Sequence, residues 1–399
     1  MTMKKTGNYT AIRVEGKRSR KEFLDTARLI YKDDPVWVCP LDKQINGIFD
    51  PEQNVYYSHG KAERWVLKDG DGRLAGRIAA FIDYKTASNN RQPTGGIGFF
   101  ECINDQVAAN LLFDTAKSWL SAEGMEAMDG PINFGERDSF WGLLVGGFTH
   151  PSYEIAYNPP YYQQLFENYG FQTYFKQEGF HLDVSKPLSD RFLKIADWVA
   201  KKPGYEFRHF SWKNLDQCVK DFAEVFNTAW DSFLENFEPL KEEYIRKTIN
   251  KAKIILEEEF IWYAYKDGRP IAIYLMYPDV NLILKHLNGK LNLINKLRFI
   301  YLKKKKTMTR ARGVVMGVVP EFQNLGIESA FIMKLSEVMR RKPHYTEVEF
   351  SWVGDFNPKM RKIFISVGSL PAKDYITYRY LFDREAEFVR YPIPTDIKK

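Results

Sequence analysis

The residues with the clearest chemical potential lie in the second half of the chain. Gly313 to Val319 is a run of small and β-branched residues that predicts a strand, and Pro320 and a polar turn follow it. Apolar spacing beyond Gly326 predicts a helix. This order directs unpaired backbone N–H groups, at the positive end of a helix dipole, toward one point that suits a pyrophosphate. Gly326 permits a close backbone approach, and Gln323 adds a side-chain donor.

The segment resembles the acyl-CoA loop of the Gcn5-related N-acetyltransferase (GNAT) superfamily, whose pattern is V-x-P-x-x-Q/R-x-x-G-x-G/A. Val318, Pro320, Gln323 and Gly326 match this pattern. Glu328 departs from it, because a carboxylate stands where the family has Gly or Ala. The resemblance implies that acyl-CoA or acetyl-CoA is the co-substrate. The residues expected to bind it are Val318, Val319, Gln323, Asn324, Leu325, Gly326, Ile327, Ser329 and Asn357.

Asn357 comes from a second matching stretch, after a predicted strand over residues 347–352. GNAT proteins carry N-x-x-A-x-x-L-Y here, where the asparagine holds the pantetheine arm and the tyrosine protonates the leaving thiolate. Asn357 matches, but Phe364 stands at the tyrosine position and has no hydroxyl group. Tyr375, Tyr378 or solvent are the alternative proton donors, and Tyr378 is our candidate.

Amide formation from a thioester also requires a polarised carbonyl group and a base for the ammonium proton. A backbone N–H near Val318 or Val319 would serve the thioester oxygen. Glu349, on a predicted central strand, and Asp279, before a basic helix, are the candidate proton acceptors. The alternative for either residue is an ordinary surface or helix-capping acid. The six histidines show no metal-ligand spacing, so no metal site is expected.

The order of predicted elements is similar in the two halves, which indicates a duplicated unit. We expect an α/β (mixed α+β) fold with two tandem GNAT-like domains, residues 1–185 and 186–399, each a mixed, mostly antiparallel sheet with helices on both faces. In the first domain the corresponding turn, Asn104 to Ala109, lacks the proline and the glycine, and Asp105 has the wrong charge for a phosphate. That domain is therefore predicted to lack the CoA loop. The run Asn133–Phe148 either lines a cleft between the units or is a packed loop.

The charge of the chain is concentrated in one segment. The 399 residues carry a net charge of +7, and Lys285–Arg312 alone holds ten basic residues and no acidic one. This segment predicts a basic amphipathic helix, broken near Gly289, that contacts an anionic membrane, guides CoA phosphates or is merely solvated. No stretch is apolar enough to span a membrane, and no secretory signal is evident. We therefore expect a cytoplasmic protein. If the basic segment contacts a membrane, the protein is peripheral on its inner face. Nucleic acid is not an expected partner.

The whole layout resembles a bacterial group of double-GNAT proteins that includes acyl-CoA-dependent ceramide synthases. The stretches behind this resemblance are Asn227–Trp230, Tyr277–Asn281, Glu349–Trp352 and Tyr375–Arg379. It implies transfer of an acyl group to a primary amine. The more specific hypothesis is that this amine is a long-chain lipid amine. Two alternatives are a Fem-type transferase that uses aminoacyl-tRNA and a catalytically degenerate GNAT that binds a ligand or partner.

Overall fold

The computed structural model describes residues 3–231 and 239–393. The elements of the first half are β1 (Met3–Thr6), β2 (Tyr9–Arg13), α1 (Lys17–Ile30), α2 (Asp42–Ile48), β3 (Gly60–Lys68), β4 (Leu74–Asp83), β5 (Thr94–Cys102), α3 (Gln106–Ala122), β6 (Ala127–Gly130), β7 (Leu143–Gly146), α4 (Tyr162–Tyr169) and β8 (Gln172–Asp183). Those of the second half are α5 (Asp190–Ala200), β9 (Tyr205–His209), α6 (Leu215–Asp231), α7 (Glu242–Ala252), β10 (Ile261–Lys266), β11 (Arg269–Pro278), α8 (Asn281–Leu284), α9 (Leu293–Lys304), β12 (Arg310–Val318), α10 (Ile327–Arg341), β13 (Glu347–Gly354), α11 (Pro358–Ser366) and β14 (Leu370–Leu381).

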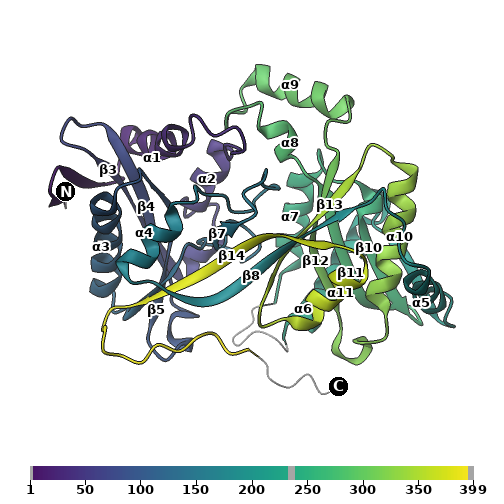
Figure 1. The fold of residues 1–399 in the computed structure, drawn as a ribbon. Helices are drawn as coiled ribbons and strands as arrows, with labels where there is room; N and C mark the ends of the chain where they lie inside the picture. The colour runs from purple at the N-terminus through teal and green to yellow at the C-terminus, as the bar shows by residue number, and fades with distance from the viewer. Residues whose placement is uncertain (1–2, 232–238, 394–399) are drawn as a thin grey trace.

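The strands of the described residues form one mixed sheet with helices on both faces (Figure 1). Its order is β1-β2-β3-β4-β5-β6-β14-β8-β13-β12-β11-β10-β9, with β7 paired to β14. Most neighbouring strands are antiparallel, but β5 pairs parallel with β6, and β12 pairs parallel with β13. Each parallel pair needs a crossover, which α3 and α10 supply. The mixed α/β fold expected from the sequence is confirmed.

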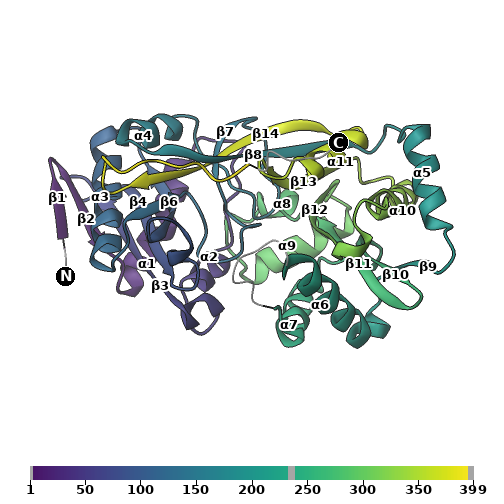
Figure 2. The ribbon, with the colours of Figure 1, turned by 90° about the horizontal axis from the view of Figure 1, so that it is seen from below.

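The two halves exchange their last strands. β8 comes from the first half and pairs with β13 of the second half, whereas β14, the last strand of the chain, pairs with β6, β7 and β8. Figures 1 and 2 show β8 and β14 side by side across the middle of the molecule. Ile376, Tyr378 and Tyr380 of β14 therefore pack in the core of the first half, while Phe180 of β8 packs in the core of the second. Each half completes its core with a strand from the other.

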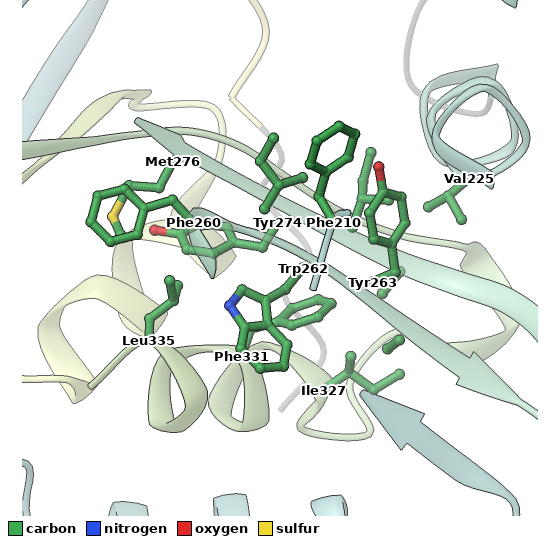
Figure 3. Close-up of a cluster of buried hydrophobic side chains, with 14 of the residues drawn as sticks. Phe210, Val225, Phe260, Trp262, Tyr263, Tyr274, Met276, Ile327, Phe331 and Leu335 are labelled. Carbon is green, nitrogen blue, oxygen red and sulfur yellow. The ribbon is translucent and has the colours of Figure 1, made fainter. Parts of the chain in front are cut away.

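The core of the second half holds α10 against the sheet. Ile327, Phe331 and Leu335 recur at four-residue steps and form the buried face of the helix (Figure 3). The Phe331 ring lies 6.3 Å from that of Tyr274 on β11, centroid to centroid. This packing fixes the N-terminus of α10 beside the end of β12, where the anion-binding turn was predicted.

The sequence predicted the break between α8 and α9 but did not predict helix α5. The break predicted at Gly289 is confirmed, because α8 ends at Leu284, α9 begins at Leu293 and Gly289 has a φ of 74°. Helix α5 was not predicted, although Ser189 caps it by accepting a hydrogen bond from the Phe192 N–H at 3.3 Å. Within the described residues, no helix is long and apolar enough to cross a bilayer.

Candidate active site

The strands β12 and β13 part near the middle of β12. Their parallel pairing runs from Arg310 opposite Glu347 to Gly313 opposite Phe350 and stops there. The register of β12 against β11 skips Val314 at the same point, which places a β-bulge beside the opening. A parted, bulged strand pair exposes backbone groups that sheet neighbours would otherwise use. Such an opening offers unpaired backbone groups to an extended ligand.

The loop after β12 leads directly to the N-terminus of α10. Pro320 begins one turn of 3₁₀-helix, and Asn324 and Gly326 then take left-handed backbone conformations with φ of 62° and 83°. The Gln323 Nε2 donates to the Val318 carbonyl at 3.2 Å, so this amide braces the loop. No side chain caps α10, because its N-cap residue is Gly326. Of the N–H groups in its first turn, that of Ser329 donates to the Gly326 carbonyl at 3.0 Å, whereas that of Ile327 has no backbone partner among the described residues and can contact an anion.

Glu328 is the residue in this loop that opposes anion binding. It lies in the first turn of α10, and burial raises the pKa of its carboxyl above the ordinary value of 4.5. A hydrogen bond from its own backbone N–H acts in the other direction and stabilises the ionised form. The departure from the family pattern therefore places a carboxyl at the N–H groups that a pyrophosphate would contact.

Helix α5 lies against the loop and was missed in the sequence. A Cβ atom on Gly326 would lie 3.1 Å from the Val199 side chain and 3.8 Å from that of Ile195. Trp198 lies on the same helix, and Lys202, two residues beyond its end, places its ammonium 3.7 Å from the Trp198 ring centroid. Trp198 is 62% exposed. The helix that carries this exposed aromatic ring therefore packs against the turn at Gly326 through Val199 and Ile195.

The corresponding turn of the first half carries its own anion. The Asp105 carboxylate accepts hydrogen bonds from the N–H groups of Val107 and Ala108, at 2.8 and 3.0 Å, and so caps α3. The preceding strand pair also parts, because β5 and β6 pair only from Thr94 to Gly96 on β5. The first half therefore has the same local framework but a filled helix terminus.

Two predicted donor-binding groups already have partners within the protein. The Asn357 Oδ1 accepts a hydrogen bond from the Met360 N–H at 3.2 Å and caps α11, although the side chain remains exposed. The Val319 N–H donates to the Ile271 carbonyl at 2.9 Å. The loop residues from Val318 to Ser329 are brought together at one end of the sheet, as their adjacency in the chain requires.

The predicted carboxylates lie in a buried ion-pair network between the halves. The Asp279 side chain is fully buried and its Oδ2 lies 2.6 Å from an Arg310 guanidinium nitrogen. Asp279 also accepts hydrogen bonds from the N–H groups of Tyr153 and Asn281. Glu349 pairs with Lys373 at 2.7 Å and with Arg310 at 3.2 Å. Both carboxylates are neutralised by cations, which is the arrangement that buried charges need for stability.

The predicted tyrosine lies away from this network. Tyr378 is on the part of β14 that pairs with β6, and its hydroxyl donates to Glu167 at 2.8 Å within the first half. Tyr375, three residues earlier, is 2% exposed. Its hydroxyl has no hydrogen-bond partner among the described residues. Burial and the nearby Glu349 both raise the pKa of the Tyr375 hydroxyl, so Tyr375 lies nearer to the ion-pair network than Tyr378 does.

A residue that the sequence did not single out stands at the opening between β12 and β13. Arg312 is fully buried, and its guanidinium donates to Ser351 Oγ at 3.3 Å and to the Tyr277 hydroxyl at 2.8 Å. The Ser351 hydroxyl in turn donates to the Gly313 carbonyl at 3.0 Å. Gly313 is the last residue of β12 that pairs with β13. Arg312 also lies 4.0 Å from a carboxylate oxygen of Glu154.

Glu154 has the features of a tuned carboxyl group. It comes from the connection between β7 and α4, in a left-handed conformation with a φ of 66°. It accepts hydrogen bonds from Gln44 Nε2 at 2.6 Å and Ser139 Oγ at 3.3 Å. Desolvation raises the pKa of its carboxyl above the ordinary value, and the nearby Asp138 acts in the same direction. A carboxylate with a raised pKa is a better proton acceptor than an ordinary one.

Two cavities lie near Glu154 and the opening between β12 and β13. One encloses about 100 Å³, and its walls include Glu154, Tyr153 and Phe140 of the first half together with Asn281 and Leu284 of α8. The other, of about 40 Å³, is mostly apolar and lies between α10 and the sheet. Its lining residues include Tyr274, Met276, Leu335, Met339, Val348 and Phe350. Within the described part of the chain, no cluster of histidine, cysteine, aspartate or glutamate side chains is arranged to hold a metal ion.

Comparison with known proteins gives relatives over nearly the whole chain. The bacterial ceramide synthase of Caulobacter vibrioides is 28% identical over 383 residues, covering 93% of this chain and 97% of that protein. Protein YghO of Escherichia coli is 26% identical over 367 residues, covering 91% and 93%. The crystal structure of a tandem GNAT protein from the clavulanic acid biosynthesis pathway has a TM-score of 0.56 and 12% identity, covering 95% of this chain and 99% of that one. No family model matches the sequence.

Proposed function

We propose that this chain, which shares the fold of a tandem GNAT protein and is similar over nearly its whole length to a bacterial ceramide synthase, is an N-acyltransferase that uses acyl-CoA as donor and a primary amine as acceptor. The amine nitrogen attacks the thioester carbonyl carbon, the carbon–sulfur bond breaks and an amide forms. The proton lost by the amine ends on the CoA thiolate. The observation that carries the proposal is the parted, bulged strand pair that leads into an uncapped helix N-terminus.

We propose that the donor binds along β12. The pyrophosphate contacts the N–H groups after Gly326, with Gln323 bracing the loop, and Trp198 and Lys202 flank the nucleotide end. From the loop to the bulge at Val314, about five strand residues span roughly 16 Å, which suits an extended pantetheine arm. The acyl end then reaches the apolar cavity beside Phe350, which accepts a short chain without rearrangement.

The proposed proton acceptor is Glu154. The Arg312 guanidinium lies between Glu154, at 4.0 Å, and Ser351, at 3.3 Å. Glu154 is therefore close to the opening between β12 and β13, where we place the thioester carbonyl. Its raised pKa suits the removal of a proton from an ammonium group at neutral pH. In this proposal Glu349 and Asp279, the carboxylates predicted from the sequence, hold Arg310 and Lys373 and thereby fix the two halves.

For the acceptor we propose a lipid amine, such as a long-chain base. The support is the relative named bacterial ceramide synthase and the cavity that Glu154 lines together with aromatic, apolar and polar side chains of both halves. The reaction would take place in the cytoplasm, with the protein peripheral on the inner face of the membrane.

The test is an acyl-transfer assay with purified protein. Acetyl-, octanoyl- and palmitoyl-CoA are each offered with a sphingoid base and with a short alkylamine, and amide products are identified by mass spectrometry. We expect CoA-dependent amide formation with the sphingoid base and a thermal shift with at least one acyl-CoA. If no thioester raises the melting temperature and no amine is acylated, the proposed function is wrong.

A further inference from the structure

Helix α9 has apolar side chains on two opposite sides. Phe299 is buried and Leu302 is partly buried, and both pack with residues of α8 in a small core cluster. The outward side carries five further large apolar side chains that the protein does not cover. Their exposed fractions are 74% for Leu293, 76% for Ile294, 61% for Leu297, 43% for Ile300 and 55% for Tyr301.

These five residues form one stripe. Successive helix residues are about 100° apart, so the five lie within an arc of about 120° on the face opposite Phe299. The basic amphipathic helix predicted from the sequence therefore has two apolar sides instead of one. Phe299 anchors the helix, and Leu293 belongs to the outward stripe.

Basic side chains surround the stripe. The segment Lys285–Arg312 carries ten basic residues and no acidic one. None of the lysines and arginines between 285 and 306 forms a salt bridge with a residue that the structure describes. Lys304 lies within the arc of the stripe, and Lys296 and Lys303 border it. An apolar stripe beside cations that have no acidic partner in the described residues complements a bilayer surface that bears anionic headgroups.

The position of α9 in the molecule is suited to such a contact. Figure 1 shows α8 and α9 projecting at one edge of the molecule, beyond the sheet. Asn281 and Leu284 of α8 line the cavity that contains Glu154, and the chain continues from them directly into α9. A surface that held α9 would therefore stand close to the cavity proposed for the acceptor.

We propose that the outward face of α9 is a docking surface for an anionic lipid bilayer. Leu293, Ile294, Leu297, Ile300 and Tyr301 enter the headgroup region, and the neighbouring lysines contact the lipid phosphates. This inference rests on the exposed surface and its charge alone. It stands independently of the identity of the amine acceptor, and it deepens the proposed function by bringing the acceptor cavity to the membrane.

The test is co-sedimentation with vesicles of phosphatidylcholine alone and with about one-third phosphatidylglycerol. The triple variant Leu293→Ser, Ile294→Ser, Leu297→Ser removes the stripe and leaves the anchor residues in place. We expect wild-type protein to bind the anionic vesicles, less at high salt, and the variant to bind at least about tenfold more weakly. The matched control is Val55→Ser with Leu370→Ser, which alters residues that are 55% and 64% exposed elsewhere.

The control variant should bind vesicles as wild type does. Both variants should keep the melting temperature and the activity toward a detergent-dispersed amine, because α9 lies outside the proposed catalytic groups. Wild-type protein that ignores anionic vesicles, or a triple variant that binds them equally well, would overturn the proposal. So would a stripe-dependent dimer in solution, because the face would then be covered by a second copy.

Discussion

The two halves of this protein solve the same local problem in opposite ways at the start of a crossover helix. In the first half, the Asp105 carboxylate caps α3 by accepting from the Val107 and Ala108 N–H groups. In the second half, Gly326 begins α10 and offers no side chain. An N-cap carboxylate that accepts from two first-turn N–H groups, as Asp105 does, occupies the place of a phosphate, whereas the Glu328 carboxyl of α10 accepts a hydrogen bond from its own backbone N–H. This difference supports the proposal that the second half binds the donor.

A second contrast concerns the gap between the parallel strands. Where β5 and β6 part, the chain after β6 closes against β5, because the Ile132 N–H donates to the Ile97 carbonyl at 2.8 Å. A Cβ atom on Gly98 would lie 1.9 Å from the Ile132 carbonyl oxygen. Among the described residues, β12 and β13 have no such closure beyond Gly313 and Phe350. The first half thus retains the fold and fills the places where a donor would lie.

The largest effect on activity is expected when the N-cap position of α10 receives a carboxylate, as α3 has in Asp105. Gly326→Asp places an anion at the N-terminus of α10 and forces a side chain into a φ of 83° beside Val199. We expect kcat/KM for acyl-CoA to fall at least ~100-fold through charge repulsion and strain. The matched control is Gly124→Asp after α3, which also has a φ of 83° but open space around it. The control should lose stability and keep activity; equal activity in both variants would contradict the comparison.

The next effect concerns the contribution of the first half to the chemistry. Glu154→Gln removes the proposed proton acceptor, and we expect kcat to fall about 100-fold with a changed pH–rate profile. Glu349→Gln should instead lower the melting temperature, because it leaves Lys373 without its buried carboxylate and removes one of the two carboxylates that Arg310 contacts. Rate measurements across pH and thermal denaturation separate the two. Loss of activity in a stable Glu349→Gln protein, with Glu154→Gln unaffected, would return the role to Glu349.

A moderate effect is expected at Glu328. Burial raises the pKa of its carboxyl above the ordinary value of 4.5. The group is therefore neutral in acid, and it becomes charged as the pH rises through its raised pKa. Its charge then opposes the pyrophosphate, and wild-type affinity for CoA should weaken with rising pH over that window. Glu328→Gln should bind CoA several-fold to ~10-fold more tightly at neutral pH and lack this decline. The matched control is Glu321→Gln in the same loop, at an exposed residue paired with Arg269.

The smallest effect on activity is expected in the first half. Asp105→Ala removes the cap of α3 and should lower the free energy of unfolding by about 1 kcal/mol. Activity should be unchanged, because the gap between β5 and the following chain stays closed. Denaturant unfolding and the transfer assay together check both statements. A variant that gained a second CoA site would show that Asp105 alone closes the first half.

The sequence predicted those features whose causes are local. Pro320, the left-handed Gly326 and the periodicity of α10 are neighbours in the chain, so strand, turn and helix could be inferred together. The capping role of Asp105 also follows from its position before an apolar-periodic helix. The break at Gly289 is a further case, because a glycine between apolar runs is a local signal.

The remaining features depend on pairings between distant parts of the chain. β14 joins the first half through contacts with β6 and β8, and its own alternation of residues does not indicate its neighbours. Glu154 meets Arg312 across 158 positions and lies in an irregular connection without a motif. Helix α5 is different, because Ser189 and the spacing of Phe192, Ala196 and Val199 were sufficient to predict it.

The central claim is that one half of the chain binds the donor and the other does not. Isothermal titration of the wild-type protein with CoA measures this directly, through the number of sites per chain. We predict one site per chain, lost in Gly326→Asp and unchanged in Gly124→Asp. Two sites per chain, no binding at all, or a single site that persists in Gly326→Asp would contradict the account.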